Sequence, residues 1–207
     1  MEQGSFDVLG LTSDEKKSFQ ATFDKLQDVF NLKIERKFNF NFKVFNIFKA
    51  YGDYYIRDAF KLIDPTSYAH LTFTEVWYSF AGGRSGQSNG NEHQIWGIGY
   101  LKNNYGNILV QPETLLLKFQ ELIEPLEIDF TEDKKFSKRF YLMATNKELA
   151  IKFFKPEVRE LFLSLDSNDF YIEIKGHILI IGNKKTVSPK YGIEIGNFVR
   201  TISSMGL

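Results

Sequence analysis

Cysteine is absent from this chain of 207 residues, which excludes disulfides, thiolate catalysis and cysteine-ligated zinc or iron–sulfur sites. Net charge is absent as well, because Lys and Arg together number 26 and Asp and Glu together number 26. A neutral chain has no overall field that attracts nucleic acid or an anionic membrane, so we expect no nucleic-acid partner. The lack of cysteine fits a reducing compartment, and we expect a cytoplasmic location in which peripheral membrane association stays open.

Long apolar runs are also missing. No stretch of the chain approaches the roughly 18 consecutive apolar residues that a membrane-spanning helix requires. The first residues, MEQGSFDVLG, lack the basic stretch and apolar core of a secretory signal. We therefore expect no spanning segment within this sequence, although an anchor encoded outside it stays open.

Known catalytic and cofactor motifs are the third absence. His70, His93 and His177 are far apart and show no metal-ligand spacing such as H-E-x-x-H. The chain has no G-x-S-x-G nucleophile turn. Residues 80–94, FAGGRSGQSNGNEHQ, match neither a phosphate-binding loop nor a dinucleotide-binding fingerprint. We expect no metal and no cofactor.

The residues that are present predict a globular protein with a large aromatic core. Hydrophobic residues make up 43% of the chain, and 21 residues are Phe. Predicted helices and strands occur in clumps, with hairpins among them, which indicates an α+β fold with an antiparallel sheet and flanking helices. We expect residues 1–37 to form an N-terminal amphipathic helix that packs on the core, and residues 38–207 to form a single α+β domain.

The clearest helix is SDEKKSFQATFDKLQDVFNLK, for which Ser13 is the expected N-cap. Its apolar residues recur at helical spacing and form one face; they are Phe19, Phe23, Leu26, Val29 and Phe30. We expect this face to pack on the core. Binding to a partner or a membrane surface is the alternative, which the mixed charges of the polar face weaken.

In the first half of the domain, the sequence pattern predicts secondary structure less clearly. Alternation of Phe and Asn at residues 38–42 favours a strand, with a helix as the competing interpretation. The stretch DYYIRDAFKLIDPTS resembles a short helix that ends at Asp64-Pro65. LTFTEVWYSF, HQIWGIGYL and ILVQPE are three predicted strands. Gly97 and Gly99 within the second of these indicate a bulge or a close backbone approach.

In the second half of the domain, the sequence pattern predicts secondary structure more clearly. LLLKFQELIEPL predicts a helix that ends at Pro125, and KRFYLMAT predicts a strand. The helical pattern from Asn146 contains Pro156, so we expect a kink or two successive helices. DFYIEIKGHILIIGN predicts a hairpin that turns at Lys175-Gly176, and YGIEIGNFVRTISSM predicts a final helix.

Candidate site residues come from loops and charged clusters. Residues 80–94 predict a long hairpin loop, and long loops often carry function, so Arg84, Glu92 and His93 are candidate binding residues there. Charged clusters follow later in the chain. Glu127 with Asp129 and Glu132 with Asp133 are acidic pairs, for which we expect a solvated surface or a capping role. Two basic clusters are suited to phosphate or lipid head groups, with a solvated surface as the competing interpretation; they are Lys134, Lys135, Lys138 and Arg139, and Lys184, Lys185 and Lys190.

Residues 107–182 resemble a bacterial family of uncharacterised proteins. The resemblance rests on LEIDFTEDKKFSKRFYLMATNKELAIKFFKPEVRELF and FYIEIKGHILIIGN, and VWYSFAGG, HQIWGIGYL and ILVQPET are similar to the middle of the same family. The matching positions are Phe136, Ser137, Phe140, Asn146, Phe154, Pro156 and Gly176. Many members carry hydrophobic helices ahead of this region, which implies a membrane tether, whereas this chain has an amphipathic helix there. The resemblance implies a fold and no catalytic residues.

The sequence therefore favours a non-enzymatic binding or interaction module, with a protein or a small molecule as its partner. The many aromatic residues suit an interface or a groove. The alternative is an enzyme of unrecognised type whose site lies near residues 81–94, which requires Arg84, Glu92 and His93 to converge on one cavity.

Overall fold

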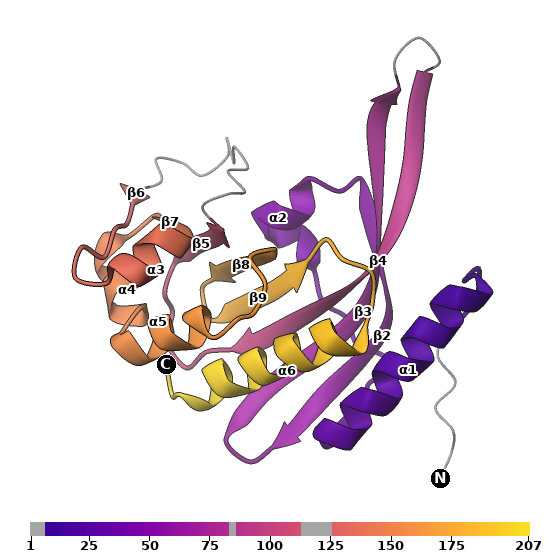
Figure 1. Ribbon diagram of the computed structural model, residues 1–207, viewed down its shortest axis with the longest axis horizontal. Coiled ribbons are helices and arrows are strands. Elements are labelled where there is room, and N and C mark those ends of the chain that lie inside the picture. The colour runs from indigo at the N-terminus through magenta and orange to yellow at the C-terminus, as the bar shows by residue number, and fades with distance from the viewer. Residues whose placement is uncertain (1–6, 83–85, 113–125) are drawn as a thin grey trace.

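The computed structural model describes residues 7–82, 86–112 and 126–207, and the α+β prediction is confirmed. Nine antiparallel strands form one sheet in the order β1-β2-β3-β4-β9-β8-β5-β7-β6 (Figure 1). The strands are β1 (Leu32–Ile34), β2 (Asp53–Asp64), β3 (Ser67–Gly82), β4 (Gly86–Tyr100), β5 (Asn107–Pro112), β6 (Leu126–Glu127), β7 (Phe140–Ala144), β8 (Phe170–Lys175) and β9 (Ile178–Asn183). The helices are α1 (Ser13–Val29), η1 (Phe42–Val44), α2 (Asn46–Lys49), α3 (Lys134–Arg139), α4 (Lys147–Phe153), α5 (Pro156–Leu163) and α6 (Pro189–Ser204).

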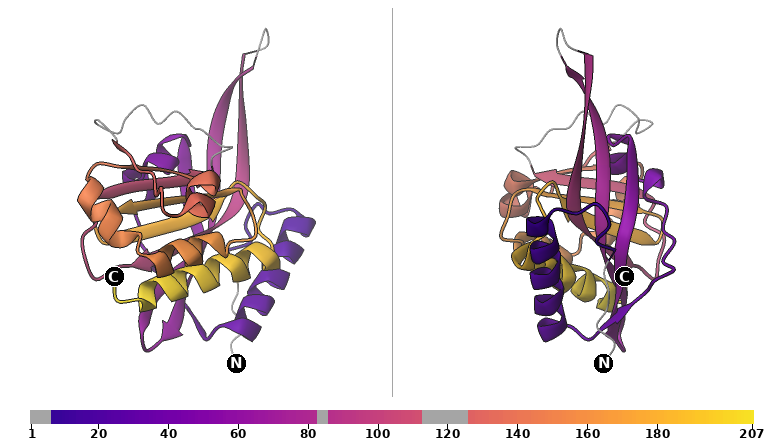
Figure 2. Two further views of the ribbon diagram at one scale, coloured as in Figure 1. Left: turned by 60° about the vertical axis from the view of Figure 1, so that its left-hand side comes forward. Right: turned by 90° about the vertical axis from the view of Figure 1, so that its right-hand side faces the viewer.

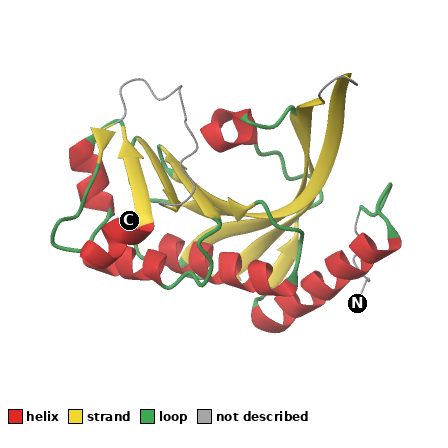
Figure 3. Ribbon diagram, turned by 45° about the horizontal axis from the view of Figure 1, so that its top comes forward, coloured by secondary structure: helices red, strands yellow, loops and turns green. Residues whose placement is uncertain are grey.

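The sheet has a core on each face. Figure 3 shows it as a curved layer with most helices on one side and a short helix on the other. The larger core, which we call the α6 face, joins residues of α1, α3, α4, α5 and α6 to the sheet. The smaller core, which we call the α2 face, packs the aromatic segment around η1 and α2 against the other side of the strands.

Helix α1 packs on the core as predicted. Its cap is Thr12, one residue before the expected Ser13, and Thr12 forms a capping box with Glu15. Phe19, Phe23 and Leu26 are buried in the α6-face core, which α6 and the sheet complete. Strand β1 follows and pairs with β2, so residues 1–37 also supply one edge strand of the sheet.

Three local predictions are wrong. Residues 53–64 form strand β2, which turns tightly at Pro65 and Thr66 into β3. A register shift between Ile56 and Asp58 breaks the alternation along β2, which explains why the pattern resembled a helix. Residues 38–41 form no strand, and the rings of Phe38 and Phe40 stack 6.0 Å apart beside the α2-face core.

The third correction concerns residues 80–94. Most of this stretch is strand and not loop, because β3 continues to Gly82 and β4 begins at Gly86. The two strands pair in register from Ala69↔Gly99 to Gly82↔Gly86. Figures 1 and 2 show the hairpin standing out from the body of the protein.

In the C-terminal half of the chain, the observed helices and strands agree with those predicted from the sequence. Pro156 begins α5 directly after α4, so the expected break gives two helices. Strands β8 and β9 form the predicted hairpin, in which Gly176 has a φ of 63°. The C-terminal helix is α6, and β7 begins after the short helix α3. The helix predicted for LLLKFQELIEPL falls almost entirely on residues 113–125, outside the described residues.

Candidate functional site

The structure separates the candidate residues of the hairpin. Glu92 and His93 are consecutive residues of β4, so their side chains point to opposite faces of the sheet. Glu92 lies on the α2 face, and His93 lies on the α6 face, where its ring packs against Phe19. The two residues therefore do not share one cavity, and Arg84 falls on residues 83–85, outside the described part of the chain.

Glu92 belongs to a hydrogen-bonded network that fixes the α2 face. Its Oε1 accepts from the Tyr78 hydroxyl at 3.0 Å, and its Oε2 accepts from Gln94 Nε2 at 3.1 Å. Gln94 Oε1 in turn accepts from Trp96 Nε1, and Gln94 Nε2 also donates to the Tyr51 hydroxyl. Burial raises the pKa of Tyr51 to about 12. This network ties the chain after α2 to the sheet, which is a structural task.

His93 belongs to a buried ionic cluster on the α6 face. Its Nδ1 lies 2.9 Å from Glu15 Oε1, and its Nε2 lies 3.6 Å from Glu75 Oε2. Glu75 also pairs with the Arg57 guanidinium and accepts from Asn91 Nδ2 at 2.6 Å. The cluster joins α1, β2, β3 and β4. Within the described ranges, no group of His, Asp and Glu side chains is placed to hold a metal ion.

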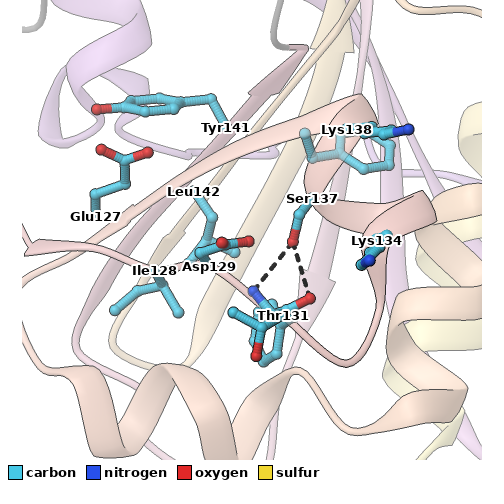
Figure 4. A pocket seen from close by; sticks show the side chains of 11 residues that line it. Glu127, Ile128, Asp129, Thr131, Lys134, Ser137, Lys138, Tyr141 and Leu142 are labelled. Atoms are coloured by element: carbon cyan, nitrogen blue, oxygen red, sulfur yellow. Dashed lines mark hydrogen bonds between the residues drawn. The ribbon is translucent and has the colours of Figure 1, made fainter.

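A pocket of about 370 Å³ lies where β6, β7 and α3 meet (Figure 4). Its lining includes buried apolar side chains together with charged and hydroxyl side chains at the rim. The lining residues are Glu127, Ile128, Asp129, Phe130, Thr131, Lys134, Ser137, Lys138, Phe140, Tyr141 and Leu142. Strand β6 ends the sheet on this side and pairs only with β7 among the described strands, so the pocket sits at a sheet edge.

The pocket brings together the two charged clusters that the sequence shows separately. Glu127 and Asp129 are exposed and Ile128 between them is buried, so both acidic residues lie on the outer side of this segment. Lys134 and Lys138 are four residues apart on α3 and share one face of that helix. In Figure 4 the Glu127 carboxylate lies across the pocket from the two lysines, with Asp129 between them.

The four charged side chains of the pocket are not engaged by other residues in the part of the chain that the structure describes. Glu127, Asp129, Lys134 and Lys138 belong to exposed residues. None of them forms an ion pair or a hydrogen bond with another described residue, although oppositely charged partners line the same opening. The pocket therefore offers an acidic end and a basic end at the same time.

The walls of the pocket are held by contacts behind its surface. Ser137 Oγ accepts from the backbone N–H of Phe130 at 3.0 Å and donates to its carbonyl at 3.2 Å, which clamps the acidic segment to α3. Asp133 caps α3 by accepting from Phe136 N–H, and it pairs with Arg159 at 2.9 Å. The Arg159 guanidinium lies 4.6 Å from the centre of the Phe130 ring. These contacts preorganise the site.

A second pocket of about 500 Å³ lies between α5 and α6, next to Asp166, Lys190 and Glu194. Glu194 Oε1 accepts the backbone N–H of Asp166 at 2.5 Å, so its carboxylate holds the chain after α5. Burial raises the pKa of Glu194, although the hydrogen bonds from the backbone of Asp166 and Ser167 oppose that rise. We assign this pocket no ligand.

Comparison of the chain with protein-family models, with curated proteins and with solved structures gave no match. Membership of the uncharacterised bacterial family therefore stays a prediction. None of the helices in the described part of the chain has the length and apolar character to cross a membrane.

Sequence reasoning named the four charges of the first pocket but not their meeting. Thr131 and the clamp formed by Ser137 were missed, although Ser137 stands among the positions that resemble the bacterial family. The available signal is a basic group that begins five residues after an acidic pair, and this spacing is too general to place both clusters around one opening.

Proposed function

We propose that this protein is a non-enzymatic binding module, and that its ligand is a small dipolar molecule with an ammonium group and a carboxylate. The observation that carries the proposal is the separation of charge in the pocket of Figure 4, with Glu127 and Asp129 facing Lys134 and Lys138. We place the protein in the cytoplasm, because its lack of cysteine suits a reducing compartment.

The electrostatics of the pocket favour such a ligand. Like charges four residues apart on a helix destabilise it by about 0.2–0.5 kcal/mol. An anion placed between Lys134 and Lys138 would therefore relieve their mutual repulsion. Glu127 and Asp129 gain in the same way from a cation. A ligand that carries both charges satisfies both ends, whereas a simple ion satisfies only one.

The size and the apolar lining narrow the ligand class. A volume of about 370 Å³ falls at the small end of the roughly 300–1,000 Å³ that small-molecule pockets span. Ile128, Phe140 and Leu142 are buried apolar residues of the lining and suit a short aliphatic or aromatic side chain. A free amino acid or a short peptide matches the charges, the size and the lining.

The competing function is an enzyme with its site near residues 81–94. That function requires Arg84, Glu92 and His93 to act on one substrate. Glu92 and His93 lie on opposite faces of the sheet, and both already hold structural contacts. These observations favour the binding module.

The test is a calorimetric titration of the full chain with free amino acids and with dipeptides. Binding should weaken at least tenfold in the double variant Lys134→Gln/Lys138→Gln and in the double variant Glu127→Gln/Asp129→Asn. Lys135→Gln and Glu148→Gln are matched controls, because both residues are exposed and lie outside the pocket. Absence of binding by every amino acid and dipeptide, or equal loss in the controls, would contradict the proposal.

A further inference from the structure

The hairpin of β3 and β4 extends beyond every neighbouring strand. We call residues 78–82 and 86–92 the arm. Strand β2 stops pairing with β3 at Asp53↔Trp77, and β9 stops pairing with β4 at Trp96↔Gly182. Figures 1 and 2 show the arm projecting from the body as a two-stranded ribbon. Within the described residues, neither outer edge of the arm has a strand beside it.

Natural proteins usually protect such edges, and three of the usual devices are absent from the described strands of this arm. Edge strands are commonly blocked by lysine, by proline or by a bulge. The sequence of residues 78–92, YSFAGGRSGQSNGNE, contains neither lysine nor proline, and Arg84 and Glu92 are its only charged residues. The register between its strands runs without a shift from Tyr78↔Gly90 to Gly82↔Gly86. An isolated two-stranded ribbon is marginally stable in water, so a further strand along its edge would stabilise it.

We propose that the arm pairs edge to edge with the arm of a second copy of this chain, with β4 against β4 in antiparallel orientation. The free edge of β4 is the longer one. It covers residues 86–92 and ends where Val187 N–H donates to the carbonyl of His93. The free edge of β3 covers only residues 78–82, because the carbonyl of Trp77 accepts from Gly52 N–H.

A second copy fits this edge because the edge is compatible with itself. When two identical antiparallel strands pair about a twofold axis, a residue that follows the central residue lies opposite the residue that precedes the central residue of the other copy by the same number of positions. With Asn89 at the centre, Glu92 of one copy lies opposite Gly86 of the other, so the two carboxylates are far apart. Arg84 is not among residues 86–92. No like charges face each other, and like charges that face each other across strands destabilise a pair.

The expected dimer is weak and depends on protein concentration, because a short strand pair buries little area compared with a standard interface. The pairing joins two ribbons into a four-stranded sheet through backbone hydrogen bonds. The arm and the ligand pocket lie on different parts of the sheet, at β4 and at β6–β7. Dimerisation and ligand binding are therefore tested separately, and neither depends on the other.

The first experiment is sedimentation equilibrium of the full chain over a wide range of concentration. The wild type should show a reversible dimer. Asn89→Lys should be monomeric, because it places two lysines side by side at the twofold axis, and a variant in which Asn-Gly replaces residues 80–88 should also be monomeric. Asn103→Lys is the matched control on an exposed loop, and it should dimerise like the wild type.

The second experiment uses the natural lack of cysteine. Single variants Asn89→Cys and Ser79→Cys place one thiol on β4 and one on β3, which pair with each other within the arm. Oxidation should join two copies of Asn89→Cys much faster than two copies of Ser79→Cys. Three results would overturn the proposal. The wild type could stay monomeric at every concentration, Asn89→Lys could leave the dimer unchanged, or both cysteine variants could cross-link equally. Occupation of the arm only by a different protein would also overturn it.

Discussion

His93 Nδ1 lies 2.9 Å from Glu15 Oε1, so a strand in the middle of the sheet contacts the first turn of α1. The same carboxylate accepts from the backbone N–H and the hydroxyl of Thr12, at 2.8 and 2.7 Å, and completes the capping box. Glu15 therefore contributes both to the cap of α1 and to the contact of α1 with the sheet. The hydrogen bond from the Thr12 backbone is the main reason why the pKa of Glu15 lies below its ordinary value.

Replacement of Glu15 should therefore destabilise the fold. We expect Glu15→Gln to lower the free energy of unfolding by about 1 kcal/mol, the usual size of a lost cap interaction. Because folding lowers the pKa of Glu15, its contribution is present above the unfolded pKa and is lost as the pH falls through the folded pKa. Urea denaturation at pH 7 and near pH 4 should show a smaller difference between variant and wild type at the lower pH.

The control for Glu15 is Glu148, which also lies in the first turn of a helix and is exposed without such contacts. Glu148→Gln should change the unfolding free energy by less than about 0.5 kcal/mol, as is usual for surface substitutions. Equal effects of the two substitutions would show that the contacts of Glu15 add nothing beyond the helix dipole.

Asp58 should give the opposite pH dependence. Burial raises its pKa from 3.8 to about 6, although the N–H of Asp7 donates to its carboxylate and opposes that rise. Asp58 therefore stays protonated to a higher pH in the folded state than in the unfolded state. Its contribution to stability is full below about pH 4 and is lost as the pH rises towards 6.

Asp58→Asn removes this titration, so its stability should decline less than that of the wild type between pH 4 and 6. Urea denaturation across that interval measures the difference. Asp24→Asn is the control, because Asp24 is exposed on α1. A wild-type profile that Asp58→Asn leaves unchanged would mean that Asp58 titrates normally in the folded protein.

Much of the fold is readable from the sequence where local and tertiary preferences agree. The hairpin at Gly176, the break at Pro156 and the helices α1 and α6 each carry a turn residue or a full apolar face. Strand β2 was missed because its bulge at Arg57 disrupts the alternation, and only pairing with β3 makes it a strand. The arm was taken for a loop because its glycines and asparagines have low strand propensity.

The candidate site was less predictable than the fold. The charges of the pocket stand on two different elements, and their meeting depends on the pairing of β6 with β7 and on the clamp from Ser137 to Phe130. Neither contact has a sequence signature. Glu92 and His93 illustrate the reverse case. They are neighbours in sequence, but their side chains point to opposite faces of the sheet because both residues lie in a strand.

Ser137 should matter for both stability and ligand binding. Ser137→Ala removes both hydrogen bonds to the backbone of Phe130, so we expect a loss of about 1–2 kcal/mol in unfolding free energy and weaker binding of the dipolar ligand. Calorimetry and urea denaturation measure the two effects. Ser164→Ala is the control, since among the described residues its hydroxyl donates to the carbonyl of Leu161 in the preceding turn and to no other group. Unchanged affinity in Ser137→Ala would mean that the clamp does not shape the pocket.

Glu173 should be the most sensitive carboxylate on the α2 face. It is 2% exposed, and its two oxygens accept from the backbone N–H groups of Asn46 and Ile47 at 2.9 and 3.0 Å. Burial raises the pKa of Glu173, and those two hydrogen bonds oppose the rise. Glu173→Leu leaves both N–H groups without an acceptor and should cost about 2–5 kcal/mol, whereas Glu173→Gln keeps one oxygen and should cost less. Equal losses would show that packing volume, and not hydrogen bonding, holds α2.

Gly97 lets α6 lie directly on β4, as the glycine pattern of this strand indicated. A Cβ at this position would lie 2.5 Å from Ile195 Cγ2 and 2.6 Å from Val199 Cγ1, closer than real carbon contacts allow. Gly97→Ala must therefore displace the side chains of Ile195 and Val199 on α6, and we expect a loss of about 1–3 kcal/mol in unfolding free energy, the usual cost of overpacking. Gly52→Ala is the control, because its Cβ would meet only the Trp77 carbonyl at 3.5 Å. If thermal and urea denaturation show equal effects for both, α6 does not pack against β4 at this distance.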